Sequence, residues 1–257
     1  MAIWSGRSSA SRGRLAAILQ GEVMPGILAA ERGSGPRCYH RPRRQQREPA
    51  MAHGQPRSGE FCYADYLAWP EGERWQLLDG HAYAVAPPST AHQRVVFELG
   101  RQIGNQPQGK PCQGFSAPMG VRLPGGDEAD EDIRTVFEPD LLVVCDASRI
   151  DARGVRGAPD FIIEVLSPST AAFDLVDKRQ RYERAGVGEL WLIDPVSSVL
   201  TVYRREGEQF TAADIRVGQG RLAVQSVPGL VLELDLLQSL RIAEQAAAYE
   251  ACEAFVA

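Results

Sequence analysis

Two apolar stretches of the sequence each carry one carboxylate where a buried strand usually has an aliphatic residue. The stretches are EPDLLVVCD, residues 138–146, and DFIIEVLSPST, residues 160–170, and the carboxylates are Asp140 and Glu164. Continuous runs of Leu, Ile and Val predict strands that are buried on both faces. A buried carboxylate without a partner is unfavourable, so each acid is expected to face one.

The patterns around these stretches predict a mixed β-sheet flanked by helices. Residues 74–89 contain two strand-like segments joined by Asp-Gly, which is typical of a hairpin. Apolar residues recur at helical spacing over residues 91–106, and residues 174–186 read as a second helix closed by a glycine. Hairpins dominate and no regular βαβα alternation is present. The fold class is therefore α/β in the mixed, α+β sense.

Composition divides the chain into three parts. The first 50 residues hold nine Arg and three Glu without apolar periodicity, and we expect a disordered basic extension over residues 1–55. This extension is either non-native upstream sequence read in frame before Met51, a targeting segment or a basic nucleic-acid arm. Residues 58–240 are expected to form the folded domain, and residues 241–257, rich in Ala and Glu, a C-terminal helix.

Charge and cysteine content exclude several classes of protein. Beyond residue 50 the chain holds 19 basic and 30 acidic residues, which is not typical of a protein that binds nucleic acid by charge alone. No apolar run reaches the ~18 residues of a membrane-spanning helix. The cysteines are odd in number and form no CxxC pair, so we expect reduced thiols and a cytoplasmic location. They are Cys38, Cys62, Cys112, Cys145 and Cys252.

The two acids are candidates for a metal site. If the two strands pair side by side, Asp140 and Glu164 converge, and Mg²⁺ or Mn²⁺ between them would remove their repulsion. The helix that follows carries Asp174, Lys178 and Tyr182 at i, i+4 and i+8, on roughly one face. Alternatively, Asp140 only caps a turn, and Asp174 and Lys178 are a solvated helix pair.

The same residues resemble a known family. EPDLLVVCD, GAPDFIIEVLSPST and DLVDKRQRYERAGVGELWLIDP closely resemble the Uma-type family of restriction endonucleases, within the PD-(D/E)XK nuclease superfamily. The resemblance covers about residues 60–240. It implies a restriction endonuclease-like mixed β-sheet core flanked by helices. It also implies Mg²⁺-dependent hydrolysis of phosphodiester bonds, with DNA as the substrate.

The resemblance assigns the catalytic positions. Pro139 and Asp140 match the PD element, and Glu164 matches the acid of the second element. The superfamily lysine usually stands two residues after that acid, where this chain has Leu166. In the Uma-type family the lysine has moved to the following helix, where Lys178 matches it. Lys178 is one of only two lysines in the chain.

Further residues are expected to support this centre. We expect a backbone carbonyl near Val165 to be a third metal ligand beside the two acids. Asp174 and Tyr182 are expected to support Lys178, which would position a water and stabilise the charge on the phosphate.

Two departures from the family pattern open an alternative. Many relatives have Glu where this chain has Gln76, and an acid where it has His81. Gln76 and His92 are expected to line the entrance to the site. The alternative is a catalytically degenerate nucleic-acid-binding or protein-interaction module on the same fold, and a weaker one is a nuclease for RNA or branched DNA. A homodimer is expected if the enzyme cuts both strands.

Overall fold

The computed structural model describes residues 56–57, 59–70, 72–105, 111–167 and 170–239. The chain separates into two units, residues 1–36 and 37–257, and all described residues belong to the second. The predicted extension over residues 1–55 and the predicted helix over residues 241–257 lie outside the described residues. Within the described part, no helix is both long and apolar enough to cross a membrane.

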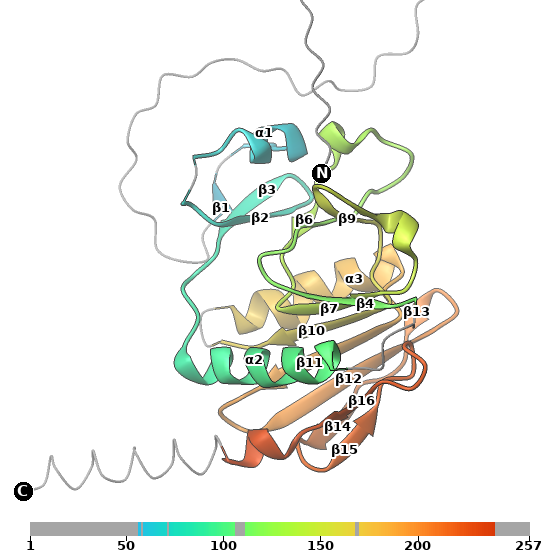
Figure 1. Cartoon of the computed structure of the whole chain (residues 1–257). Coiled ribbons are helices and arrows are strands. Elements are labelled where there is room, and N and C mark those ends of the chain that lie inside the picture. The colour runs from blue at the N-terminus through green and yellow to red at the C-terminus, as the bar shows by residue number, and fades with distance from the viewer. Residues whose placement is uncertain (1–55, 58, 71, 106–110, 168–169, 240–257) are drawn as a thin grey trace, which may run out of the picture. The chain divides into compact units, whose positions relative to one another are not determined.

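The two acidic stretches supply neighbouring strands of one sheet, here called sheet I (Figure 1). Its strands are β4 Gln113–Ser116, β7 Leu141–Val144, β10 Phe161–Val165, β11 Glu189–Asp194, β12 Val199–Glu206, β13 Gln209–Phe210 and β14 Asp214–Val217. The order is β13-β12-β11-β10-β7-β4, and β14 also pairs with β12. Because β10 is parallel to β11 and antiparallel to β7, the sheet is mixed, as the sequence predicts.

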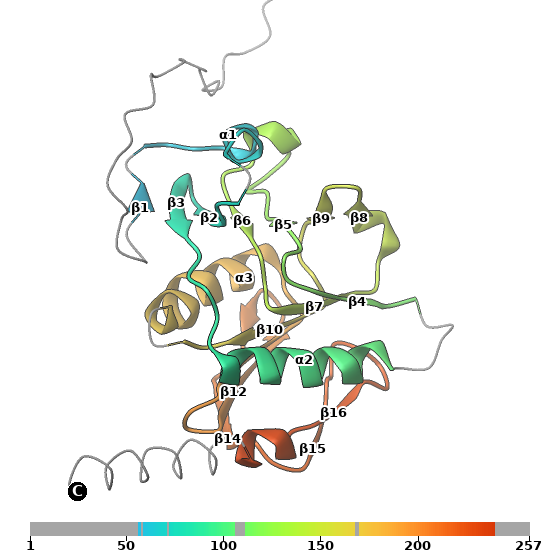
Figure 2. The same ribbon diagram turned by 60° about the vertical axis from the view of Figure 1, so that its left-hand side comes forward.

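Helices cover the two faces of β10. Ile163 packs in one core cluster with residues of α2 (Thr90–Gly104), and Ile162 packs in a second cluster with Tyr182 of α3 (Arg179–Ala185). Figures 1 and 2 show the two helices on opposite sides of this strand. Side chains alternate along a strand, so Glu164 lies on the side of α3. The sequence alone leaves this side undetermined.

A second sheet, sheet II, contains the first strands of the folded region. Its order is β1-β3-β2-β6-β5-β9-β8. Its strands are β1 Pro56–Arg57, β2 Trp75–Leu78, β3 His81–Ala84, β5 Val121–Arg122, β6 Val136–Phe137, β8 Ile150–Asp151 and β9 Gly154–Arg156. The predicted hairpin is confirmed as β2 and β3, and its turn residues Asp79 and Gly80 have φ of 47° and 87°. Both values suit the Asp-Gly turn of a tight hairpin.

The remaining elements are short. They are the helix α1 Tyr63–Leu67, the 3₁₀ turns η1 Asp130–Asp132 and η2 Ala147–Arg149, the π-helical turn η3 Phe173–Lys178, and the strand pair β15 Arg221–Ala223 and β16 Val231–Glu233. Of these, η3 carries Lys178 and leads directly into α3.

Cys112 and Cys145 form a disulfide, so the expectation of reduced thiols is wrong for this pair. Gln113 pairs with Val144 in the antiparallel β4–β7 ladder, and the two cysteines lie one residue further along, opposite each other. They are 33 residues apart in the sequence, so only the strand pairing brings them together. Disulfides are rare in cytosolic proteins, and the cytoplasmic location therefore stays a prediction.

Candidate active site

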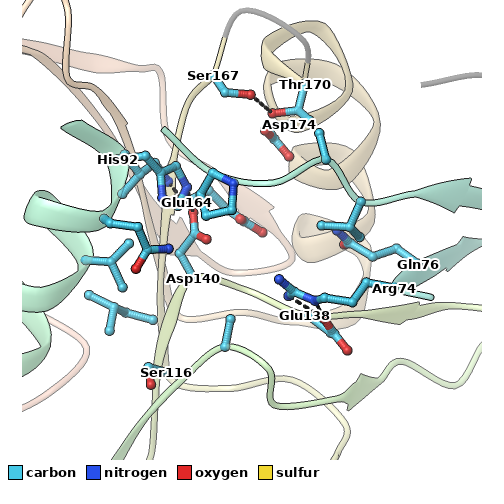
Figure 3. Close-up of a pocket in the computed structure, with 18 of the residues that line it drawn as sticks. Arg74, Gln76, His92, Ser116, Glu138, Asp140, Glu164, Ser167, Thr170 and Asp174 are labelled. Carbon is cyan, nitrogen blue, oxygen red and sulfur yellow. Dashed lines mark hydrogen bonds and ion pairs between the residues drawn. The ribbon is translucent and has the colours of Figure 1, made fainter. Parts of the chain in front are cut away.

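Asp140 and Glu164 lie close together at one end of the β7–β10 pair (Figure 3). The pairing of Ile163 with Leu141 sets the register and puts Asp140 one residue before β7 begins. The backbone N–H of Val165 donates to Oδ2 of Asp140 at 2.8 Å. This hydrogen bond fixes the first carboxylate against the strand that carries the second.

Glu164 belongs to a buried cluster of charged and hydroxyl groups. Its Oε1 accepts hydrogen bonds from Nζ of Lys178 at 3.0 Å and from the hydroxyl of Tyr182 at 2.6 Å. Asp174 Oδ1 lies 3.1 Å from the same Nζ, which is an ion-pair distance without hydrogen-bond alignment. All four residues are at most 4% exposed. The helical residues with i, i+4, i+8 spacing therefore do face Glu164, and the solvated helix pair considered from the sequence is wrong.

Lys178 reaches this cluster from the π-helical turn η3. The sequence predicts one helix over residues 174–186, whereas the structure has η3 followed by α3. Such turns, with i→i+5 hydrogen bonds, are frequent at functional sites. The rings of Phe137 and Phe173 lie 5.7 and 5.8 Å from Nζ of Lys178 and add cation–π attraction to its ion pairs.

Burial, and the presence of several carboxylates around one ammonium group, shift the pKa values in the cluster. Burial raises the pKa of Glu164 to about 7, because desolvation together with the carboxylates of Asp174 and Asp140 outweighs the attraction of Lys178. Burial also opposes the charge of Lys178, but Asp174 and Glu164 outweigh it and raise the pKa of this ammonium above its ordinary value. Lys178 therefore stays charged, while Glu164 changes charge near neutral pH.

His92 holds the other carboxylate. Its Nε2 lies 3.1 Å from Oδ2 of Asp140, and Ser89 caps α2 by accepting from the backbone N–H of His92. Burial lowers the pKa of His92, but the hydrogen bond and charge of Asp140 outweigh this and raise it. His92 is a buried partner of the acid and also lines the cavity, and its predicted place at the entrance stays a prediction. Its Nδ1 has no hydrogen-bond partner within the described residues.

Gln76 lines the same cavity as the two acids. It lies on β2 and is 8% exposed, and its Oε1 is buried with no hydrogen-bond partner in the part of the chain that the structure describes. Figure 3 shows Gln76 across the cavity from Asp140. His81 is exposed at the start of β3 and does not line the cavity.

Glu138 lines the cavity as well, although sequence reasoning gave it no role. It accepts hydrogen bonds from Arg74 at 2.6 Å and from the hydroxyl of Tyr66 at 3.1 Å. Its neighbour Pro139 belongs to the motif that marks the site, but its partner Arg74 is 64 residues away in sequence and cannot be predicted from a local pattern. Continuing the antiparallel pairing of Leu77 with Val136 by two residues sets Trp75 opposite Glu138, so the β2–β6 pairing within sheet II places Arg74 beside this acid.

A further buried acid, Glu189, shows what a satisfied structural carboxylate looks like in this fold. It is fully buried and accepts from Nε1 of Trp191 at 2.8 Å and from the backbone N–H groups of Gln225 and Ser226 at 2.6 and 3.1 Å. Both its oxygens are used. By contrast, within the described residues no hydrogen bond engages Oδ1 of Asp140 or Oε2 of Glu164.

Within the described residues, the strand register gives the carbonyl of Val165 no N–H partner on the side of β7. Continuing the pairing of Ile163 with Leu141 by two residues sets Val165 opposite Pro139. Proline has no N–H group and cannot donate to that carbonyl. The backbone pairing of β7 with β10 therefore ends at Pro139 and Asp140, beside the first carboxylate.

The oxygen atoms at this site fit a divalent cation. The second oxygens of Asp140 and Glu164, the carbonyl of Val165 and Oε1 of Gln76 are hard oxygen ligands of the kind that Mg²⁺ and Mn²⁺ prefer. Among the described residues no group of three or more His, Cys, Asp or Glu side chains could hold a metal. Mg²⁺ commonly takes only one or two carboxylates and keeps several waters, so two acids suffice.

The site opens into a cavity of about 860 Å³. Besides the residues above, its wall is formed by the segment that joins β3 to α2, by one side of α2 and by β4. A volume of this size is in the range, ~300–1,000 Å³, that accommodates an organic ligand rather than an ion alone.

The fold and the cavity together define a class of protein. Its members have a restriction endonuclease-like mixed sheet with two acids at the ends of neighbouring strands. The family model described as "Putative restriction endonuclease", Uma2, matches residues 63–236, and the chain belongs to this family. The resemblance seen in the sequence is thereby confirmed.

Two individual relatives are similar to the chain. A solved structure, described as a putative nuclease belonging to DUF820 from Anabaena variabilis, has a TM-score of 0.56 and 21% sequence identity. The match covers 70% of this chain and 99% of that one. The "Uncharacterized protein slr1290" of Synechocystis sp. is 24% identical over 182 residues, which are 67% of this chain and 88% of that protein. The structural likeness confirms the predicted fold class.

Proposed function

We propose that this chain is a metal-dependent endonuclease that hydrolyses phosphodiester bonds of DNA. The observation that carries the proposal is the meeting of Asp140 and Glu164 at one cavity wall, with the buried ammonium of Lys178 against Glu164. The cofactor would be Mg²⁺ or Mn²⁺, held by the two carboxylates and the carbonyl of Val165. When bound, such a cation supplies Lewis acidity that polarises a phosphoryl oxygen and lowers the pKa of a water.

The chain's own residues would hold and orient the reacting groups. Lys178 keeps its charge because Asp174 and Glu164 lie within 3.1 Å of Nζ, so it can donate to a phosphate oxygen as negative charge develops there. Asp174 and Tyr182 act as positioning residues for this pair. His92 fixes the rotamer of Asp140 through their hydrogen bond and leaves its second oxygen towards the cavity.

A catalytically inert nucleic-acid-binding or protein-interaction module is the second candidate. It is favoured by Gln76, an uncharged amide on the cavity wall where many relatives have Glu. It is also favoured by the acidic balance of the chain beyond residue 50. Calorimetric titration with Mn²⁺ separates the two candidates, because an inert module has no need of a specific metal site.

Plasmid cleavage tests the proposed activity directly. The full-length chain is incubated with supercoiled DNA and Mg²⁺, and a parallel sample contains EDTA. Asp140→Asn and Glu164→Gln remove one charge each with little change of shape, and Asp146→Asn removes an exposed acid just beyond β7 as the matched control. We expect cleavage to need Mg²⁺ and to be lost in the first two variants but kept in the control. Cleavage that persists in both site variants would reject the mechanism.

Two wider expectations accompany this proposal. Cutting both strands of a duplex at one place requires two copies of a single site, so a homodimer remains a prediction that light scattering can check. The cytoplasmic location also remains a prediction, which fractionation of the native cells would check.

A further inference from the structure

The cavity extends well beyond the two acids, along one side of α2. Gln93, Phe97, Gly100 and Gly104 recur at i, i+4, i+7 and i+11 and therefore form one stripe along the helix. Together with Gly114 and the neighbouring residues of β4, they line the part of the cavity that we call the α2 groove. None of these groove residues has a role in the proposed hydrolysis.

Phe97 is the most unusual residue of this groove. Its side chain is 75% exposed, and in the described part of the chain it is the single aromatic residue among the exposed large hydrophobic ones. One exposed apolar side chain is ordinary on a protein surface, but Phe97 also lines the cavity that holds the two acids, where its ring can stack against a ring of a ligand.

Glycines shape the α2 groove. A Cβ at Gly104 would meet no atom within 4 Å, whereas a Cβ at Gly100 would lie 3.2 Å from Cδ2 of Leu141. A Cβ at Gly114 would collide with Ile103 of α2. Gly114 thus lets β4 approach the helix, and Gly104 leaves open space on the same stripe of α2 as Phe97.

The edge of sheet I supplies hydrogen-bonding groups to the same space. β4 is the last strand of its sheet, and Ala117 donates its N–H to the carbonyl of Asp140, towards β7. Backbone groups alternate in direction along a strand, so those of Gly114 and Ser116 point away from β7. The groove therefore offers an aromatic face together with backbone donors and acceptors.

Charge argues against a duplex held by its phosphates. Among the described residues, three Lys or Arg side chains line the cavity, and each already has a carboxylate partner within 3.1 Å: Arg74 with Glu138, Arg101 with Glu98, and Lys178 with Glu164 and Asp174. Binding by phosphate neutralisation needs unpaired cations. A single strand depends on phosphate neutralisation less steeply than a duplex does, and stacking of its bases on aromatic rings adds to its affinity.

We propose that the α2 groove binds an unpaired base of single-stranded DNA, which stacks on Phe97 while its phosphate lies at the two acids. This inference rests on the proposed function for its choice of ligand. The preferred substrate is accordingly a single strand, an overhang or a frayed end rather than an intact duplex.

Binding without catalysis tests the proposal. The full-length chain, with Ca²⁺ (a hard cation for the same oxygen ligands) in place of Mg²⁺, is titrated into a fluorescein-labelled DNA strand of about 12 nucleotides, and separately into the blunt duplex of the same sequence, with anisotropy as the readout. We expect the single strand to bind about tenfold tighter or more. Equal or tighter binding of the duplex would overturn the inference.

Substitutions locate the base. We expect Phe97→Ala to weaken binding of the single strand about 5- to 100-fold, the scale of one lost stacking contact. Phe97→Trp should retain binding, and Phe97→Leu should behave like the alanine variant if stacking rather than apolar area matters. The matched control is Ile215→Ala, which removes a 68% exposed side chain on β14. An unchanged affinity in Phe97→Ala would refute the site.

Gly104→Leu adds an apolar side chain to the groove at a position where a Cβ meets no atom within 4 Å. We expect this variant to weaken the single-strand complex while its melting temperature stays at or above that of the parent chain, because Leu favours a helix more than Gly does. Binding as tight as the parent's would contradict the groove.

The outcomes separate this inference from the proposed function. Tight, Phe97-dependent binding of the single strand without any metal-dependent cleavage would reject the nuclease and support the groove. Cleavage of intact duplex that is unaffected by Phe97→Ala would support the nuclease and reject the groove.

Discussion

The buried ion cluster makes a quantitative prediction for Lys178→Met, which removes the ammonium but keeps an apolar stem between the rings of Phe137 and Phe173. Nζ lies 3.0 Å from Glu164 and 3.1 Å from Asp174. At an effective dielectric of about 20, each contact contributes about 5 kcal/mol of gross attraction. Desolvation of the three charges offsets most of this, and loss of one partner from a buried pair lowers the free energy of unfolding by about 3–5 kcal/mol.

The matched control is Arg101→Met, which breaks the pair of Arg101 with Glu98 at 2.6 Å. The Arg101 side chain is 51% exposed, and exposed pairs contribute about 0–1 kcal/mol. Distance alone would rank this shorter pair as the stronger one, whereas burial ranks it as the weaker. Urea unfolding of both variants and the parent chain at pH 8, in EDTA, measures the difference.

The pH dependence gives the prediction a second readout. Below pH 7 the carboxyl of Glu164 becomes protonated in the folded state, so less uncompensated charge remains when Lys178 is removed. The loss of stability in Lys178→Met should therefore be smaller at pH 5 than at pH 8. The reasoning is refuted if Lys178→Met loses no more stability than Arg101→Met, or if its loss is the same at both pH values.

Three more predictions follow. Because burial raises the pKa of Glu164 to about 7, Mn²⁺ must displace a proton from this carboxyl below that pH. Calorimetry should therefore show the affinity for Mn²⁺ falling about tenfold per pH unit from pH 7 to pH 5, with little change above pH 8. An affinity that does not change with pH would contradict this. Gln76→Glu should raise Mn²⁺ affinity about tenfold by adding a carboxylate to the cavity wall, whereas the exposed Gln113→Glu should not, and equal affinities would exclude Gln76 from the site. Reduction of the Cys112–Cys145 disulfide, which encloses a loop of 33 residues, should lower the free energy of unfolding by about 3–4 kcal/mol in urea, and no change with dithiothreitol would show that the bond contributes nothing.

Local patterns in the sequence were enough to locate the two acids and the lysine. Runs of Leu, Ile and Val with one carboxylate predict Asp140 and Glu164 as buried residues; Glu164 is buried, whereas Asp140, just before its strand begins, is partly exposed. The i, i+4 spacing of Asp174 and Lys178 likewise predicts a shared face. Each inference needs only the geometry of one element and the pairing of two consecutive strands.

Partners from distant elements could not be predicted in the same way. The bond between His92 and Asp140 spans 48 residues and depends on how α2 packs beneath β7. The same holds for the pairing of Cys112 with Cys145, which follows from strand order and not from spacing. Tertiary packing decides these contacts, and no periodicity in a single sequence encodes it.

The π-helical turn also has a consequence for which changes in length the chain can tolerate. Deleting one residue within Phe173–Lys178 would tighten this turn towards an α-helix and rotate everything after it by about 100° around the helix axis. Lys178 and Tyr182 would then swing away from β10, although every side chain of the cluster would still be present. Homologues should therefore vary freely in length at exposed loops but keep a constant residue count between Glu164 and the lysine.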